Sequence, residues 1–109
     1  MRDSRIPEEV AAFEARLRGR VQGVGFRYFA QRVGQRLDLR GLVRNEWDGS
    51  VYVKAEGPRA VLEEFLVQLR QGPSAAVVEG CEVRWIPPGE TRGGGGGFRI
   101  GTGDERGGG

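Results

Sequence analysis

The sequence contains no histidine and only one cysteine, Cys81. Histidine is the side chain that most often serves as a general base near neutral pH, and it is a common zinc ligand. Its absence removes phosphohistidine chemistry and most zinc sites, so catalysis has to use arginine, amide, carboxylate and backbone groups. A single cysteine excludes an internal disulfide, and we expect Cys81 to be a packed core thiol.

Long apolar segments are also missing. No apolar run approaches the ~20 residues that a membrane-spanning helix needs. The first ten residues are polar and have no apolar h-region, so no secretory signal is visible. We therefore expect a cytoplasmic protein without a membrane partner. A chain of 109 residues, 38% hydrophobic and 29% charged, fits one globular domain.

Acidic residues are scarce in one part of the chain. Eight arginines and one acid, Asp38, lie between Arg16 and Arg44, whereas the remainder of the chain is acidic on balance. Such a local positive field attracts anions over ~10 Å at ordinary salt. Because 16 of the 17 basic residues are arginine, we interpret most of them, including Arg20 and Arg44, as solvated charge.

The apolar periodicity predicts an alternating arrangement of strands and helices. Period-two alternation and helical spacing give strands at 13–21, 39–45, 51–56, 77–86 and 98–100, and helices at 27–38 and 58–71. This order predicts an α+β, ferredoxin-like βαββαβ sandwich with two helices on one face of an antiparallel sheet of four or five strands. Gly34 weakens the first helix by roughly 1 kcal/mol relative to alanine, which a close approach of helix to strand would explain.

Three segments lack this periodicity. Residues 1–10 and 101–109 are expected to be a disordered N-terminal extension and a disordered glycine-rich tail around a domain at 11–100. The glycine run 93–97 is expected to form a flexible surface loop.

The segment Gly19–Arg27, which reads Gly-Arg-Val-Gln-Gly-Val-Gly-Phe-Arg, lies where the first strand gives way to the first helix. A glycine-rich bend there leaves several backbone N–H groups pointing into one small space, and the helix dipole adds roughly half a positive charge. The Arg27 guanidinium supplies a planar fork that can bind two phosphate oxygens. Tyr28 stands where a dinucleotide fingerprint needs glycine, and no Lys-Ser/Thr pair follows, so the loop predicts a site for a single phosphoryl group.

With a second motif, this segment resembles the acylphosphatase family. The Gly19–Arg27 segment resembles the family's phosphate-binding signature almost letter for letter. Gly41–Asn45, followed by Asp48–Val51, resembles the second signature, with leucine at position 42 where the family typically has tryptophan. The similarity covers about residues 13–100, and two motifs at the expected spacing make it specific.

The resemblance implies a hydrolase acting on acid anhydrides, which converts an acyl phosphate into carboxylate and inorganic phosphate. It implies that Arg27 and Asn45 are catalytic, with no metal, no cofactor and no covalent intermediate. The residues expected to bind the phosphoryl group are Gln22, Gly23, Val24, Gly25, Phe26 and Arg27. The family often has threonine where Ala30 stands, so we expect lower activity with phosphate binding retained. A monomer is the simplest expectation for the oligomeric state.

The residue types suit this chemistry independently. An acyl phosphate has a stabilised carboxylate as leaving group, and the transition state of phosphoryl transfer is loose, with charge spread over the equatorial oxygens. The loop amides and Arg27 can hold that charge, as an oxyanion hole does. The amide oxygen of Asn45 can accept a proton of the attacking water and fix its position. Gln22 is expected to contribute its backbone more than its side chain, and Asp48 to be a turn residue.

Two other functions stay open. One is a non-catalytic phosphate- or carbamoyl-phosphate-binding module, like the domain attached to hydrogenase maturation proteins, although this chain has no zinc-finger cysteines. The other is an RNA-binding module of the same topology, which would stack bases on aromatic side chains of its central strands. The polar face of the first strand offers no aromatic residue, so we expect no nucleic-acid partner. Trp47, Trp85 and Phe98 are interpreted as packing groups.

Overall fold

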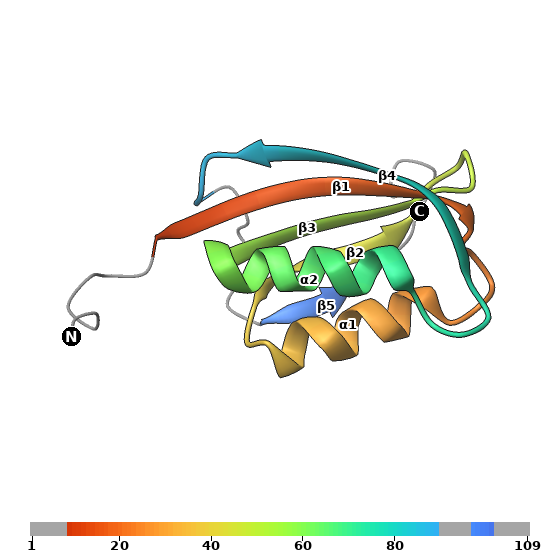
Figure 1. Ribbon diagram of the computed structural model, residues 1–109, viewed down its shortest axis with the longest axis horizontal. Coiled ribbons are helices and arrows are strands. Elements are labelled where there is room, and N and C mark those ends of the chain that lie inside the picture. Colours follow the sequence, from red (N-terminus) through yellow and green to blue (C-terminus); the bar gives the residue numbers. More distant parts are fainter. Residues whose placement is uncertain (1–8, 90–96, 102–109) are drawn as a thin grey trace.

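The computed structural model describes residues 9–89 and 97–101 of the chain (Figure 1). It has the predicted order of elements: β1 (Val10–Arg20), α1 (Phe26–Arg36), β2 (Arg40–Asn45), β3 (Val51–Pro58), α2 (Arg59–Gln71), β4 (Val77–Ile86) and β5 (Phe98–Ile100). The first strand begins earlier than the expected residue 13. The segments expected to be disordered, 1–10 and 101–109, lie outside the described residues except for Glu9, Val10 and Gly101, and Val10 belongs to β1. Most of the glycine run 93–97 also lies outside the described residues.

The five strands form one sheet in the order β4-β1-β3-β2-β5. The pairs β1–β4, β1–β3 and β2–β3 are antiparallel, as predicted, whereas β2 and β5 are parallel. The expectation of a wholly antiparallel sheet is therefore wrong at this edge. The end of β4 and the start of β2 lie at the same end of the sheet, and β5 begins there beside Gly41. It therefore runs against β4 and in the same direction as β2.

Both helices cover the same face of the sheet, and the core lies between the two layers (Figure 1). The largest fully buried side chains include Phe13 on β1, Phe26 on α1, Phe65 on α2 and Phe98 on β5. The rings of Phe65 and Phe98 meet edge to face at 5.3 Å between centroids. This contact joins α2 to the short edge strand β5 within the apolar core.

Gly34 on α1 explains how β5 packs so closely. A Cβ added at this position would lie 2.6 Å from Cγ of Phe98. No side chain fits there without a shift, so the expected close approach of helix to strand is confirmed. The helix ends where Asp38 takes a left-handed φ of 62°. Neither α1 nor α2, the two helices of the described chain, is long and apolar enough to cross a membrane.

The other face of the sheet carries polar side chains, and neither α1 nor α2 covers it (Figure 1). Alternation along β1 places Phe13 and Leu17 in the core and Glu14 and Arg16 on the opposite side. We call this second side the open face. It is formed by the outward-pointing residues of β1, β2, β3 and β4, among them Tyr52 on β3.

Candidate anion-binding site

The loop between β1 and α1 has the left-handed bends that its glycines predict. Gly23 has φ 75° and Gly25 has φ 82°. These angles favour glycine, because a Cβ makes the left-handed region costly for other residues. A Cβ built at either position would meet no atom within 4 Å. The glycines are thus required by the backbone conformation, and the space over the loop is open.

The start of α1 leaves its backbone amides available. Gly25 is the N-cap, without a side-chain cap and without an acidic residue in the first turn. The first backbone bond of the helix runs from Phe29 N to Gly25 O at 3.0 Å. Within residues 9–89 and 97–101, the N–H groups of residues 23–28 donate no hydrogen bond to another residue. Unpaired donors at the positive end of a helix dipole bind anions.

Arg27 lies in the first turn of this helix and is half-buried. Its predecessor Phe26 is only 1% exposed and packs edge to face on Phe29 at 5.9 Å between centroids. Phe26 therefore fixes the first turn in the core. In the described part of the chain, no carboxylate pairs with the Arg27 guanidinium. No carboxylate of these residues uses the charge of Arg27, which can therefore act on a bound anion.

Asn45 is the last residue of β2 and pairs with Val51 across the sheet. Val43, two residues earlier, is fully buried under the helices. Side chains two apart on a strand share a face, so Asn45 belongs to the helix-covered side. The β2–β3 turn that follows Asn45 lies at the same end of the sheet as the β1–α1 loop (Figure 1). The fold thereby places the two predicted catalytic elements at one end of the molecule.

The side chain of Gln22 joins these two elements directly. Its Nε2 donates to the backbone oxygens of Glu46 at 2.9 Å and of Ser50 at 2.8 Å. An amide NH₂ has two donors, so these bonds use both of them. The expected backbone role of Gln22 remains a prediction, while its side chain has a structural task that sequence reasoning missed. No local pattern signals it, because the acceptors lie 24 and 28 residues away.

The turn between β2 and β3 is itself well bonded. Asp48 Oδ1 accepts from the backbone N of Ser50 at 3.0 Å and from its hydroxyl at 2.6 Å, which confirms Asp48 as a turn residue. These bonds from Ser50, with a third from Arg18, hold the pKa of Asp48 well below its usual range. Trp47 at the tip is 69% exposed, so its predicted packing role is wrong.

Arg44 was expected to be a solvated charge, yet it is engaged on the open face. Its Nε donates to Glu46 Oε2 at 2.7 Å, and its guanidinium carbon lies 4.4 Å from the centre of the Tyr52 ring. Arg16 approaches the same ring at 5.4 Å and pairs with Glu46 Oε1 at 3.4 Å. The signal for this arrangement is the strand register, which aligns Arg16, Tyr52 and Arg44 in one row across β1, β3 and β2.

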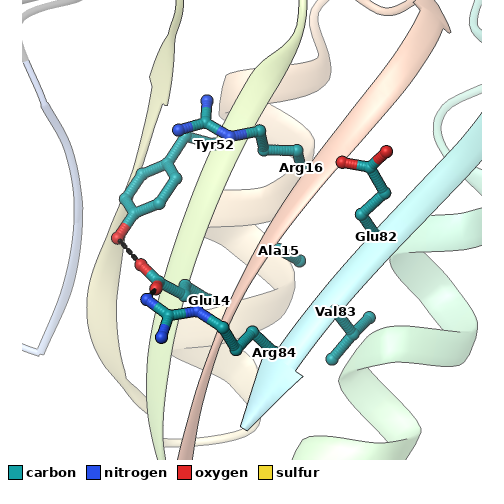
Figure 2. Close-up of a pocket in the computed structure, with 7 residues that line it drawn as sticks. All are labelled: Glu14, Ala15, Arg16, Tyr52, Glu82, Val83 and Arg84. Carbon is teal, nitrogen blue, oxygen red and sulfur yellow. Dashed lines mark hydrogen bonds and ion pairs between the residues drawn. The ribbon is translucent and has the colours of Figure 1, made fainter. Parts of the chain in front are cut away.

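A cavity of about 330 Å³ opens on the open face, at a distance from the loop along β1. It is lined by Glu14, Ala15, Arg16, Tyr52, Glu82, Val83 and Arg84 (Figure 2). None of these is a predicted site residue. Their charges are used locally: Glu14 accepts from the Tyr52 hydroxyl at 2.7 Å and pairs with Arg84.

The contact between Glu14 and Tyr52 also shifts the pKa values of both groups. The hydrogen bond from Tyr52 is the main cause that lowers the pKa of Glu14, and burial raises the pKa of Tyr52. The carboxylate therefore stays ionised and the phenol protonated near neutral pH, and the hydroxyl of Tyr52 is already used by its bond to Glu14. We place the candidate anion site at the loop and not in this cavity. Among the described residues, no three His, Cys, Asp or Glu side chains are grouped as metal ligands.

Comparison with known sequences agrees with this site. The family model described as acylphosphatase matches residues 13–100. An acylphosphatase of Salinibacter ruber is 54% identical over 71 residues, which cover 65% of this chain and 75% of that protein. An acylphosphatase of Moorella thermoacetica is 49% identical over 85 residues, covering 77% of this chain and 86% of the relative.

Solved structures give the same assignment. The crystal structure of acylphosphatase from Bacillus subtilis superposes with a TM-score of 0.76 at 34% identity, covering 84% of this chain and 99% of that one. Full-length HypF in its phosphate- and nucleotide-bound form gives a TM-score of 0.79 at 28% identity, over 90% of this chain but 12% of HypF. The match to the family model spans both predicted motifs and residues of all five strands, and the chain belongs to the acylphosphatase family.

Proposed function

We propose that this member of the acylphosphatase family hydrolyses the carboxyl–phosphate anhydride of acyl phosphates, using the loop after β1 as its phosphoryl receptor. The observation that carries the proposal is the pairing of unbonded amides at the start of α1 with an Arg27 that has no carboxylate partner in the described chain. In this account Gln22, Gly23, Val24, Gly25, Phe26 and Arg27 bind the phosphoryl group, the first five through their backbone.

Charge stabilisation is the first half of the proposed reaction. Negative charge on the equatorial oxygens of a loose transition state is held by the loop amides and by the bidentate Arg27 fork. These donors are fixed before substrate arrives, because Phe26 anchors the helix start in the core. Fixed donors stabilise charge without having to reorganise during the reaction.

Positioning of water is the second half. The side-chain oxygen of Asn45 accepts a hydrogen bond from the attacking water and holds it in line with the bond to the leaving carboxylate. Within the described residues the Asn45 side chain has no hydrogen bond that would compete for this oxygen. The leaving group is a stabilised carboxylate, so no strong base is required, and we propose that a substrate phosphate oxygen takes the proton.

Hydrolysis of benzoyl phosphate in excess EDTA tests the proposal. We expect turnover that EDTA does not reduce, and competitive inhibition by inorganic phosphate because phosphate occupies the same loop. Uncompetitive inhibition would contradict the assigned loop.

The alternative is a non-catalytic phosphate- or carbamoyl-phosphate-binding module, favoured by the likeness to HypF in its phosphate-bound form. Folded protein that binds phosphate but does not turn over benzoyl phosphate would favour this alternative. An RNA-binding role has less support, because Tyr52, an open-face aromatic residue, is 9% exposed and flanked by Arg16 and Arg44. We further propose that the chain acts in the cytoplasm as a monomer, without a nucleic-acid partner.

A further inference from the structure

The two chain neighbours of Asn45 are bonded to each other through their side chains. Arg44 and Glu46 flank it, and their side chains are joined on the open face by the 2.7 Å bond from Arg44 Nε to Glu46 Oε2. In an extended chain, residues i−1 and i+1 point to the side opposite residue i. A bridge between them therefore holds the backbone of Asn45 extended and keeps its side chain on the helix-covered side.

This bridge is anchored to the rest of the sheet. Glu46 Oε1 also pairs with Arg16 at 3.4 Å, and the Glu46 side chain is only 16% exposed. Both arginines lie against the ring of Tyr52. The Tyr52 hydroxyl is in turn bonded to Glu14 (Figure 2). Arginines from two strands, β1 and β2, thus hold one carboxylate, and the Tyr52 ring on β3 packs against both arginines. This restricts the Glu46 side chain far more than a single surface ion pair does.

The backbone of Glu46 is held from the other side. Its carbonyl accepts from Gln22 Nε2 at 2.9 Å and from Gly49 N at 3.1 Å, and its own N–H donates to Ser50 O at 2.9 Å. Glu46 is therefore the residue at which the open face, the β2–β3 turn and the phosphoryl loop meet. It lies directly next to Asn45 in the chain.

We propose that Glu46 is a positioning residue for the reaction: its carboxylate, bridged to Arg44 and Arg16 on the open face, fixes Asn45 relative to the phosphoryl loop. The inference rests on the proposed role of Asn45 in orienting water. Glu46 touches neither the substrate nor the water. Glu46 acts by turning Asn45 toward them. Its loss should therefore lower kcat and leave phosphate affinity nearly unchanged.

The test compares Glu46→Ala with Glu46→Gln and with the matched control Glu82→Gln. Glu82 is an exposed open-face acid that pairs with Arg18 at 3.6 Å but does not flank Asn45. We expect Glu46→Ala to lower kcat for benzoyl phosphate by about tenfold, because a small misplacement of the water costs rate. Glu46→Gln, which keeps the shape and an acceptor for Arg44, should retain more activity. The inhibition constant for phosphate should change by less than about twofold in both.

Arg44→Ala and the double variant Arg44→Ala/Glu46→Ala complete a double-mutant cycle with Glu46→Ala. If the bridge is the active unit, Arg44→Ala loses kcat as Glu46→Ala does, and the double variant is no worse than either single one. Thermal unfolding of each variant shows that the protein assayed is folded. A purely structural role for Glu46 would shift the unfolding temperature and leave kcat at lower temperature unchanged.

The outcomes separate this inference from the proposed function. Unchanged kcat in folded Glu46→Ala, an equal loss of kcat and phosphate affinity, or the same loss in Glu82→Gln would each overturn the positioning role while leaving the hydrolase intact. Wild-type protein that does not hydrolyse benzoyl phosphate, or Asn45→Ala with wild-type turnover, would overturn the proposed mechanism and this inference with it.

Discussion

Arginines occur in two contrasting settings in this molecule. On the open face, Arg16, Arg18, Arg44 and Arg84 each have a carboxylate partner. At the start of α1, Arg27 has no such partner within residues 9–89 and 97–101. The same side chain is therefore structural in one region and available to a ligand in the other.

The comparison shows that the number of arginines is a poor guide to anion binding. The basic segment from Arg16 to Arg44 suggests a broad positive field, yet four of its arginines pair with acids outside the segment: Arg16, Arg18, Arg40 and Arg44. Surface pairs of this kind contribute little to stability, with a median of ~0–1 kcal/mol. What distinguishes Arg27 is its place beside unbonded backbone amides.

The largest effect is expected for Arg27→Lys. A lysine keeps the charge but loses the planar fork, so kcat/KM for benzoyl phosphate should fall by ~10²–10³. The matched control is Arg18→Lys on the open face, where Asp48 and Glu82 already hold the charge. Its rate should stay close to that of the wild type. Near wild-type turnover by Arg27→Lys would reject the assigned role.

The next effect belongs to Asn45→Ala. Removing the amide that orients water should lower kcat by about 10²-fold while phosphate affinity changes little. Steady-state kinetics with phosphate as competitive inhibitor measure the two quantities together. Equal losses in both would mean that Asn45 binds the anion and does not orient the water.

Gln22→Ala removes the two hydrogen bonds that join the phosphoryl loop to the β2–β3 turn. We expect about a tenfold loss of kcat and ~1 kcal/mol of stability, since the Glu46 and Ser50 oxygens each lose one donor. The matched control is Gln35→Ala, which loses a similar bond from Nε2 to Phe98 O at 3.1 Å. It should cost similar stability and leave kcat unchanged; if both variants lose kcat alike, the link has no special role.

The smallest expected effect is on the pH dependence of stability, through the Asp48 carboxylate. Its pKa is lowered in the folded protein, chiefly by bonds from Ser50, so the stability it contributes is present above the ordinary aspartate pKa of about 3.9. That contribution is lost as the pH falls below this value toward the folded pKa. The difference in unfolding temperature between the wild type and Asp48→Asn should therefore narrow on going from pH 7 to about pH 2.5. A difference that is constant across this range would contradict the assignment.

Local signals in the sequence predicted most of the fold. The alternation along β1 and the helical spacing of α1 and α2 follow from burying one face of each element, which a sequence displays directly. The glycine bend was equally readable, because Gly23 and Gly25 take the left-handed angles that glycine permits. The direction of β5 could not be predicted from the sequence. This strand has only three residues and follows a glycine run, so no pattern shows which strand it pairs with or in which direction.

The contacts that set the site's geometry were harder to predict. The bonds of Gln22 and the pairing of Arg44 join residues whose proximity depends on strand register and on the turn. Register is a property of the whole sheet and cannot be read from one segment. The exposure of Trp47 was missed for the same reason, because the turn that presents it is fixed by distant partners such as Gln22 and Arg18.

The most direct test of the central claim is a titration of ¹⁵N-labelled protein with inorganic phosphate, followed by amide chemical shifts. We expect saturable shifts concentrated in the backbone amides of residues 22–28, with the open-face amides around Glu14 and Tyr52 unchanged. Shifts confined to the open-face cavity, with the loop amides unmoved at saturation, would contradict it.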